Sequence, residues 1–209
     1  MATTTNYGWT TPDDTALVKD GASAIRALGT AIDTSMNTAL GTKKSGLVLL
    51  NTTSFSAVSS QSINDVFSST YENYSIVLSN INGSTSTQAI NFRLRKSGSD
   101  NSSNIYYRQE LNANSTTVAG ARQQLTSWTI AAARDQGPMN SFFDVTSPNQ
   151  ATIKTGVIGN FSYSSTSEVQ YQSFAGTHDL ATSADYDGFT IFPASGTMTG
   201  TVSVYGYNK

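Results

Sequence analysis

From residue 46 to the end of the chain, apolar and polar side chains alternate in short runs. Ile76 and Leu78 fall on one side of their run, and Val202 and Val204 do the same near the C-terminus. A period of two is typical of strands with one buried face. The alternation predicts nine strands: Gly46–Asn51, Ser75–Asn80, Ala89–Lys96, Thr117–Thr129, Ser141–Val145, Thr152–Ser164, Glu168–Ala175, Phe189–Phe192 and Gly200–Tyr207.

Stretches rich in Ser, Asn and Gly separate these runs, and most of the runs contain no proline. Strands with one buried face, joined by many turns, pack as an antiparallel sandwich. The number of runs fits a jelly roll. We therefore expect a mainly β fold, with residues 46–209 forming a jelly-roll-like antiparallel β-sandwich, the head domain of the chain.

Residues 21–40 follow a different period, which predicts the only helix. Ile25, Leu28 and Ile32 recur at spacings of three and four and so lie on one stripe. Asp20 is placed to cap the start of the helix, and Gly41 is placed to end it. In a heptad reading Ile25 and Ile32 both occupy position a.

A single helix of this length is not stable by itself in water and must pack on something. Two partners are open: the following domain, or copies of the same helix in a short parallel bundle. Isoleucine at position a favours three or more helices. Ile25, Leu28 and Ile32 are thus the candidate trimer interface, residues 21–41 the candidate trimeric bundle, and residues 42–45 a linker.

Residues 1–20 have neither period, and Tyr7, Trp9 and Pro12 stand there among Thr, Gly and Asp. This pattern predicts an extended arm whose aromatic side chains need a surface to bury against. The arm either folds back on its own chain or docks on another protein. Tyr7, Trp9 and Pro12 are the candidate anchor residues.

Composition narrows the class of function. Ser and Thr together make up 59 of 209 residues, whereas charged residues make up 12%, about half the usual share. The absence of Cys excludes zinc-finger, thiol and disulfide chemistry, and a net charge of −2 argues against nucleic acid as a partner. No run is long and apolar enough to span a membrane, and the N-terminus does not read as a secretory signal.

Catalysis and metal binding find little support in the residue pattern. His178 and Asp179, with Asp185 and Asp187, could hold calcium, but a turn-rich loop between strands is the preferred interpretation because EF-hand spacing is absent. A glycosidase needs paired carboxylates, and the three Glu residues lie far from these Asp residues. We expect no enzyme activity, no metal and no cofactor.

Arginines and aromatic residues in the β region leave two interpretations open. Arg93 and Arg95 share one strand face, and Arg108, Arg122 and Arg134 follow. They form either a polar outer sheet face or a site for acidic sugars or carboxylates. Three aromatic side chains are core or interface residues, or else they stack on sugar rings: Tyr106, Tyr107 and Trp128.

The N-terminal stretch resembles the opening segment of small minor-tail or tail-fibre-like virion proteins of tailed bacteriophages. Four features carry the likeness, namely Asn6–Tyr7–Gly8–Trp9, Pro12–Asp13–Asp14, Lys19–Asp20–Gly21 and the helix stripe of Ile25, Leu28 and Ile32. The ending GTMTGTVSVYGYNK is similar to the last hairpin of β heads in such proteins. The resemblance implies an N-terminal virion anchor, a short trimeric stalk and a distal trimeric β domain.

The resulting hypothesis is a non-enzymatic structural protein of a tailed-phage virion, acting as a homotrimer. Its arm would bind other virion proteins, and its head would face outward towards a host glycan or protein. The leading role is a tail fibre or receptor-binding protein, and the alternative is a head decoration or head/neck fibre protein. A carbohydrate-degrading tailspike and a bacterial adhesin are weaker rivals, and the sequence selects no receptor-binding residues.

Overall fold

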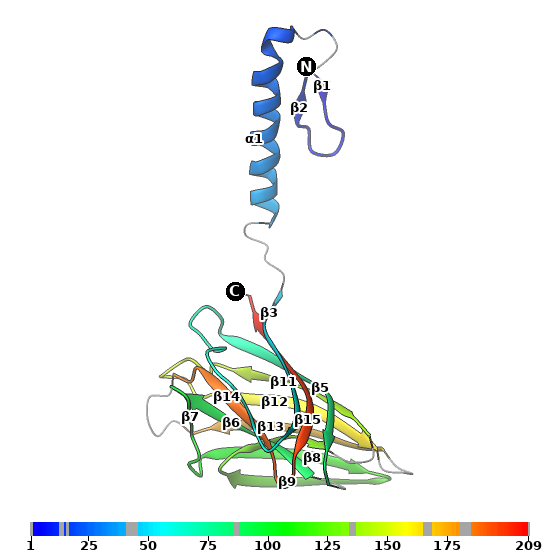
Figure 1. Ribbon diagram of the computed structural model, residues 1–209, viewed down its shortest axis with the longest axis vertical. Coiled ribbons are helices and arrows are strands. Elements are labelled where there is room, and N and C mark those ends of the chain that lie inside the picture. Colours follow the sequence, from blue (N-terminus) through cyan, green and yellow to red (C-terminus); the bar gives the residue numbers. More distant parts are fainter. Residues whose placement is uncertain are drawn as a thin grey trace. The chain divides into compact units, whose positions relative to one another are not determined.

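A computed structural model describes residues 2–12, 15, 17–40, 46–85, 88–133, 137–164, 169–179 and 185–208 (Figure 1). The chain divides into two compact units, Met1–Gly46 and Leu47–Lys209. Among the described residues no helix is long and apolar enough to cross a membrane.

The first unit is a small hairpin followed by a helix. Strands β1 (Ala2–Thr3) and β2 (Thr10–Thr11) pair antiparallel, so the arm consists of two short extended pieces folded back on each other. Gly8 makes this reversal possible, because it adopts a φ of 64° that other residues rarely adopt. Its amide donates to the Thr4 carbonyl at 3.0 Å.

The helix α1 (Gly21–Leu40) has the predicted extent at its N-terminus, but Asp20 does not cap it. Asp20 is the last residue of a 3₁₀ turn, η1 (Val18–Asp20), which runs directly into α1. The extended residue before this turn is Leu17, whose side chain makes no capping hydrogen bond. The Asp20 prediction is therefore wrong, because the chain is already helical there. Gly41 and the linker 42–45 lie outside the described residues.

The second unit contains two antiparallel sheets. In the eight-stranded sheet the strands are ordered β3 (Leu47–Val58), β15 (Met198–Tyr207), β5 (Asn73–Gly83), β11 (Met139–Thr146), β12 (Gly156–Ser164), β13 (Val169–His178), β8 (Tyr106–Asn114) and β9 (Thr117–Leu125). The smaller sheet runs β10 (Trp128–Ala133), β6 (Gln88–Lys96), β14 (Gly188–Pro193) and β4 (Gln61–Ile63), with β7 (Ser99–Asp100) paired to β6.

The inner faces of the two sheets form the core, as the alternation predicts. Ile76 and Leu78 of the large sheet are fully buried, and so are Phe92 and Leu94 of the small sheet. Phe92 meets Phe143 of β11 edge to face, with ring centroids 5.6 Å apart. The mainly β, antiparallel sandwich is confirmed. A large sheet in which β11, β12 and β13 pair in chain order does not establish jelly-roll connectivity.

The predicted strands differ from the structure at several places: the short strands β1, β2, β4 and β7 were not expected, β3 continues to Val58, and β12 starts only at Gly156. Two further differences concern longer strands. Strand β8 (Tyr106–Asn114) was not expected, because polar residues occupy its inward positions. The predicted strand Thr117–Thr129 is two strands in different sheets, β9 and β10, which separate at Thr126–Ser127. No Gly or Pro marks that turn, so the sequence carries no breaker signal there.

Candidate functional site

In the first unit, Trp9 bonds to the helix and Tyr7 stays open to solvent. The Trp9 indole donates through Nε1 to Ser35 Oγ at 2.9 Å. Tyr7 stacks on Trp9 with ring centroids 5.0 Å apart and is 71% exposed. Pro12 is also exposed. The arm was expected either to fold back on its own chain or to dock on another protein. Trp9 folds back on the helix, whereas Tyr7 and Pro12 are exposed and can contact a partner.

The apolar residues of the predicted helix stripe differ in how far they are exposed to solvent. Strand β2 lies over Ala24, Ala27 and Ala31, with a hollow of about 160 Å³ between them. Ile25 is 65% exposed, and Leu28 and Ile32 are half-buried. The hairpin therefore lies on an alanine face, and of the adjoining stripe Leu28 and Ile32 are half-buried while Ile25 stays largely exposed.

Apolar side chains also stand on the outer face of the large sheet. We call five of them the outer apolar patch: Leu111, Val118, Phe142, Ile158 and Tyr171, all exposed. They come from strands β8, β9, β11, β12 and β13, which are neighbours in the sheet. Exposed apolar groups gathered in this way usually mark an interaction surface.

Sequence reasoning missed the outer apolar patch, although a signal was present. Phe142 and Phe143 are adjacent and apolar, and so are Val157 and Ile158. Because neighbouring residues of a strand point to opposite faces, such pairs place an apolar side chain on both sides of the sheet. Phe143 and Val157 are buried, whereas Phe142 is 58% exposed and Ile158 is 57% exposed.

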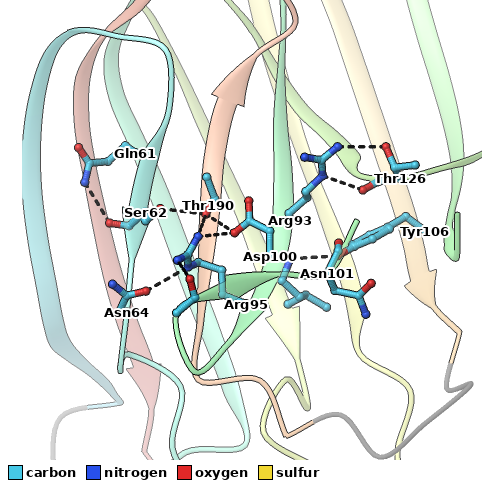
Figure 2. Close-up of polar contacts among 12 residues, drawn as sticks. Gln61, Ser62, Asn64, Arg93, Arg95, Asp100, Asn101, Tyr106, Thr126 and Thr190 are labelled. Carbon is cyan, nitrogen blue, oxygen red and sulfur yellow. Dashed lines mark hydrogen bonds and ion pairs between the residues drawn. The ribbon is translucent and has the colours of Figure 1, made fainter. Parts of the chain in front are cut away.

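Arg95 makes its contacts within the protein, as Figure 2 shows. Its guanidinium forms an ion pair with Asp100, donates through Nε to Asn64 Oδ1 at 3.0 Å and reaches the Gly98 carbonyl. Its Nη1 also donates to Thr190 Oγ1 at 2.8 Å, and that hydroxyl donates to Asp100 at 2.7 Å. This network ties β6, β7 and β14 together.

Arg93 is bound in the same manner (Figure 2). It donates through Nε to the Thr126 carbonyl at 3.0 Å and through Nη2 to Thr126 Oγ1 at 3.2 Å. The guanidinium also lies 4.6 Å from the centre of the Phe192 ring. For Arg93 and Arg95 these contacts favour the polar outer face, whereas Arg108 is buried on an inner face. Arg122 is exposed on β9, and Arg134 lies outside the described residues.

Tyr106 and Trp128 belong to the core and are not available for stacking on a sugar. Both are fully buried, and their rings meet edge to face at 5.0 Å. The Tyr106 hydroxyl donates to the Asn101 carbonyl at 2.7 Å and accepts from the Leu94 amide at 3.1 Å. Burial raises the pKa of Tyr106. Tyr107, the next residue, faces the other side of the sheet and is half-buried.

His178 is buried beside this cluster, 4.7 Å from the Tyr106 ring. Its Nε2 lies 3.2 Å from the Tyr186 hydroxyl, whereas its buried Nδ1 has no hydrogen-bond partner in the described structure. Burial lowers the pKa of His178 to about 4, against a smaller opposing effect of Asp179. A neutral imidazole in this place is a core residue.

The neighbouring Asp residues do not gather around a cation. Asp185 pairs with Lys96, Asp179 pairs with Lys154 at 3.0 Å, and Asp187 accepts from the Ser97 amide at 2.7 Å. No group of three or more metal-ligating side chains occurs in the part of the chain that the structure describes. Residues 180–184 of this loop lie outside it.

The inward positions of β8 carry a buried ion pair that the sequence analysis did not identify. Arg108 and Glu110 form it, and their side chains are 3% and 13% exposed. Arg108 also lies 5.5 Å from the centre of the Phe174 ring, and burial lowers its pKa. The alternating run Arg108, Glu110, Asn112 was the available signal, since residues two apart share a strand face.

Comparisons with known proteins give no relative for this fold or sequence. No family model, no curated protein and no solved structure matches the chain.

Proposed function

We propose that this chain is a non-enzymatic structural component of a tailed-phage virion, a homotrimeric tail fibre or receptor-binding protein. Its N-terminal unit would bind the particle and its β head would face outward. The phage assignment rests on the resemblance of the N-terminal stretch. The assembly part rests on one structural observation, the apolar side chains that are exposed in both units.

That observation supports assembly because exposed apolar area is costly in water. Ile25 on the helix and the outer apolar patch on the head are uncovered in a chain with few charges. Covering such surfaces with copies of the same chain gains about 25 cal/mol for each Å² removed from water. Isoleucine at the heptad a positions favours three copies.

Incorporation into particles tests the anchor. Tyr7→Ala removes an exposed ring that bonds to nothing else in the described chain except by stacking on Trp9. We expect this variant to fall to a small fraction of the wild-type amount in purified particles, measured by quantitative mass spectrometry. The matched control is Thr5→Ala in the same hairpin, which should be incorporated normally.

Wild-type amounts of the Tyr7→Ala protein in particles would contradict the anchor. Labelling of intact particles with an antibody to the head then separates the two roles. Label at the tail tip supports a fibre or receptor-binding protein, and label on the capsid or neck supports a decoration or head/neck fibre protein.

A further inference from the structure

The inner face of strands β8 and β9 is polar and partly open, unlike the rest of the inner surface of the large sheet. Strand β9 is the last strand of this sheet and pairs only with β8 (Figure 1). Of its nine residues, Ala121 and Gln123 are half-buried and the others are exposed. At this end of the large sheet, the inner face is therefore less buried than at the centre of the sheet.

An open hollow of about 530 Å³ lies on this part of the sheet. It is lined by Asn112, Asn114, Ser115, Thr117 and Ala119. Register places Asn112 opposite Gln172 and Asn114 opposite Gln170 on the neighbouring strand β13. Directly opposed residues have Cβ atoms about 5 Å apart, so two further amides lie beside the hollow. A volume of this size is sufficient for a small ligand.

Three buried polar atoms on the same strand face have no hydrogen-bond or ion-pair partner among the described residues. Two are donors, Nε and Nη2 of Arg108, and one is an acceptor, Oδ1 of Asn112. Glu110 Oε2 is held in the ion pair with Arg108 Nη1. An unpaired buried polar atom costs about 1–3 kcal/mol, so the Asn112 oxygen, whose residue lines the hollow, indicates a missing partner.

The residues that line the hollow restrict the ligand. They are neutral, and the charges of Arg108 and Glu110 farther along the strand cancel, so neither an anion nor a cation finds an opposite charge. The unpaired oxygen of Asn112 needs a donor. The amides of Asn112 and Asn114 both donate and accept, and the hydroxyls of a sugar complement them.

We propose that this face binds a neutral saccharide, with Asn112 as the central contact. Asn112 joins the two observations, since it lines the hollow and carries one of the unpaired atoms. Asn114 provides a second amide in the lining of the hollow. The inference names a ligand class for the head and so extends the proposed function.

Saturation-transfer NMR with purified full-length protein tests the proposal. The probes are maltotriose, lactose, chitobiose, mannobiose and methyl rhamnoside as neutral sugars, with sialyllactose and glucuronic acid as charged ones, all at millimolar concentration. We expect transfer to at least one neutral sugar and none to the charged sugars. Asn112→Ala and Asn114→Ala should each weaken binding about tenfold, the effect of one lost hydrogen bond.

Gln109→Ala is the matched control, because Gln109 belongs to the same strand and points to the opposite face. It should bind as wild type does. Asn114 is exposed, so its variant keeps the test valid if Asn112→Ala does not fold. Three results would overturn the proposal: no transfer to any neutral sugar, transfer to the charged sugars alone, or binding that both variants leave unchanged.

Failure of this proposal can be distinguished from failure of the proposed function. Asn114→Ala leaves the sequence of the N-terminal unit unchanged and should enter particles normally. If the head binds no sugar but the chain still needs Tyr7 for incorporation into particles, the saccharide proposal is wrong and the proposed virion role stands.

Discussion

His178 makes the stability of the sandwich depend on pH. Its imidazole is enclosed by the rings of Tyr106, Trp128 and Tyr186, and its buried Nδ1 has no acceptor within the described structure. A second proton on this ring would place a charge in the core without a partner. Folding therefore opposes protonation, which is why the pKa falls from 6.5 to about 4.

The sign of the effect follows from proton binding. Between pH 6.5 and about 4 the unfolded chain binds a proton that the folded protein excludes. Stability is thus complete above pH 6.5 and decreases as the pH falls, by about 2 kcal/mol between about pH 7 and about pH 5. Urea unfolding at fixed protein concentration should show this loss in wild type and little of it in His178→Gln. An equal loss in both proteins would assign the dependence to other groups.

Single positions were predicted well where one face is buried and poorly where charge is buried. Ile76 and Leu78 followed directly from alternation. The burial of Arg108 did not, because a charged side chain is expected outside unless a partner compensates it, and the partner, Glu110, lay in a strand that was not predicted. Arg93 and Arg95 were placed on the correct face, but their partners come from distant parts of the chain, such as Thr126 and Thr190.

The helix α1 carries the apolar face on which the proposed homotrimer depends. Its hairpin-facing side is small, with Ala24, Ala27 and Ala31, and its exposed side is larger and apolar, with Ile25 at its centre. A carboxylate placed in an apolar seam would have to be desolvated when copies of the chain associate.

We expect Ile25→Asp to convert trimers into monomers in analytical ultracentrifugation. The matched control is Thr30→Asp, an exposed helix position on the polar side, which should leave the mass unchanged. If wild type is itself a monomer at high concentration, or if Ile25→Asp remains a trimer, the helix is not the seam.

Strand prediction failed for a physical reason at β8. Its inward positions hold Arg108, Glu110 and Asn112, so the apolar alternation that identified other strands is missing. Its outward positions include Leu111, which reverses the usual pattern. One of these polar residues, Asn112, also lines the hollow proposed to bind a saccharide.

The molecule combines low charge with exposed apolar surface, and this determines how the proposed homotrimer should respond to salt. Contacts between apolar faces are not screened by ions, whereas contacts between charges weaken as the Debye length shortens. Charged residues make up 12% of the chain, and the outer apolar patch contains none.

The mass of the assembly should therefore be the same at about 0.05 M and about 0.5 M sodium chloride, measured by light scattering. The Ile25→Asp protein provides the monomer reference for the same measurement. Dissociation at the higher salt concentration would indicate that ion pairs, and not the apolar surfaces described above, hold the copies together.

The position of β9 at the end of the large sheet has a consequence for local motion. Strands β15 and β5 are paired on both sides, but β9 has one neighbour and little cover on either face. Amide hydrogens should exchange with solvent fastest there and slowest near the centre of the sheet. The hairpin that lines the polar hollow can thus open without unfolding the rest of the head, and a bound ligand would slow that exchange.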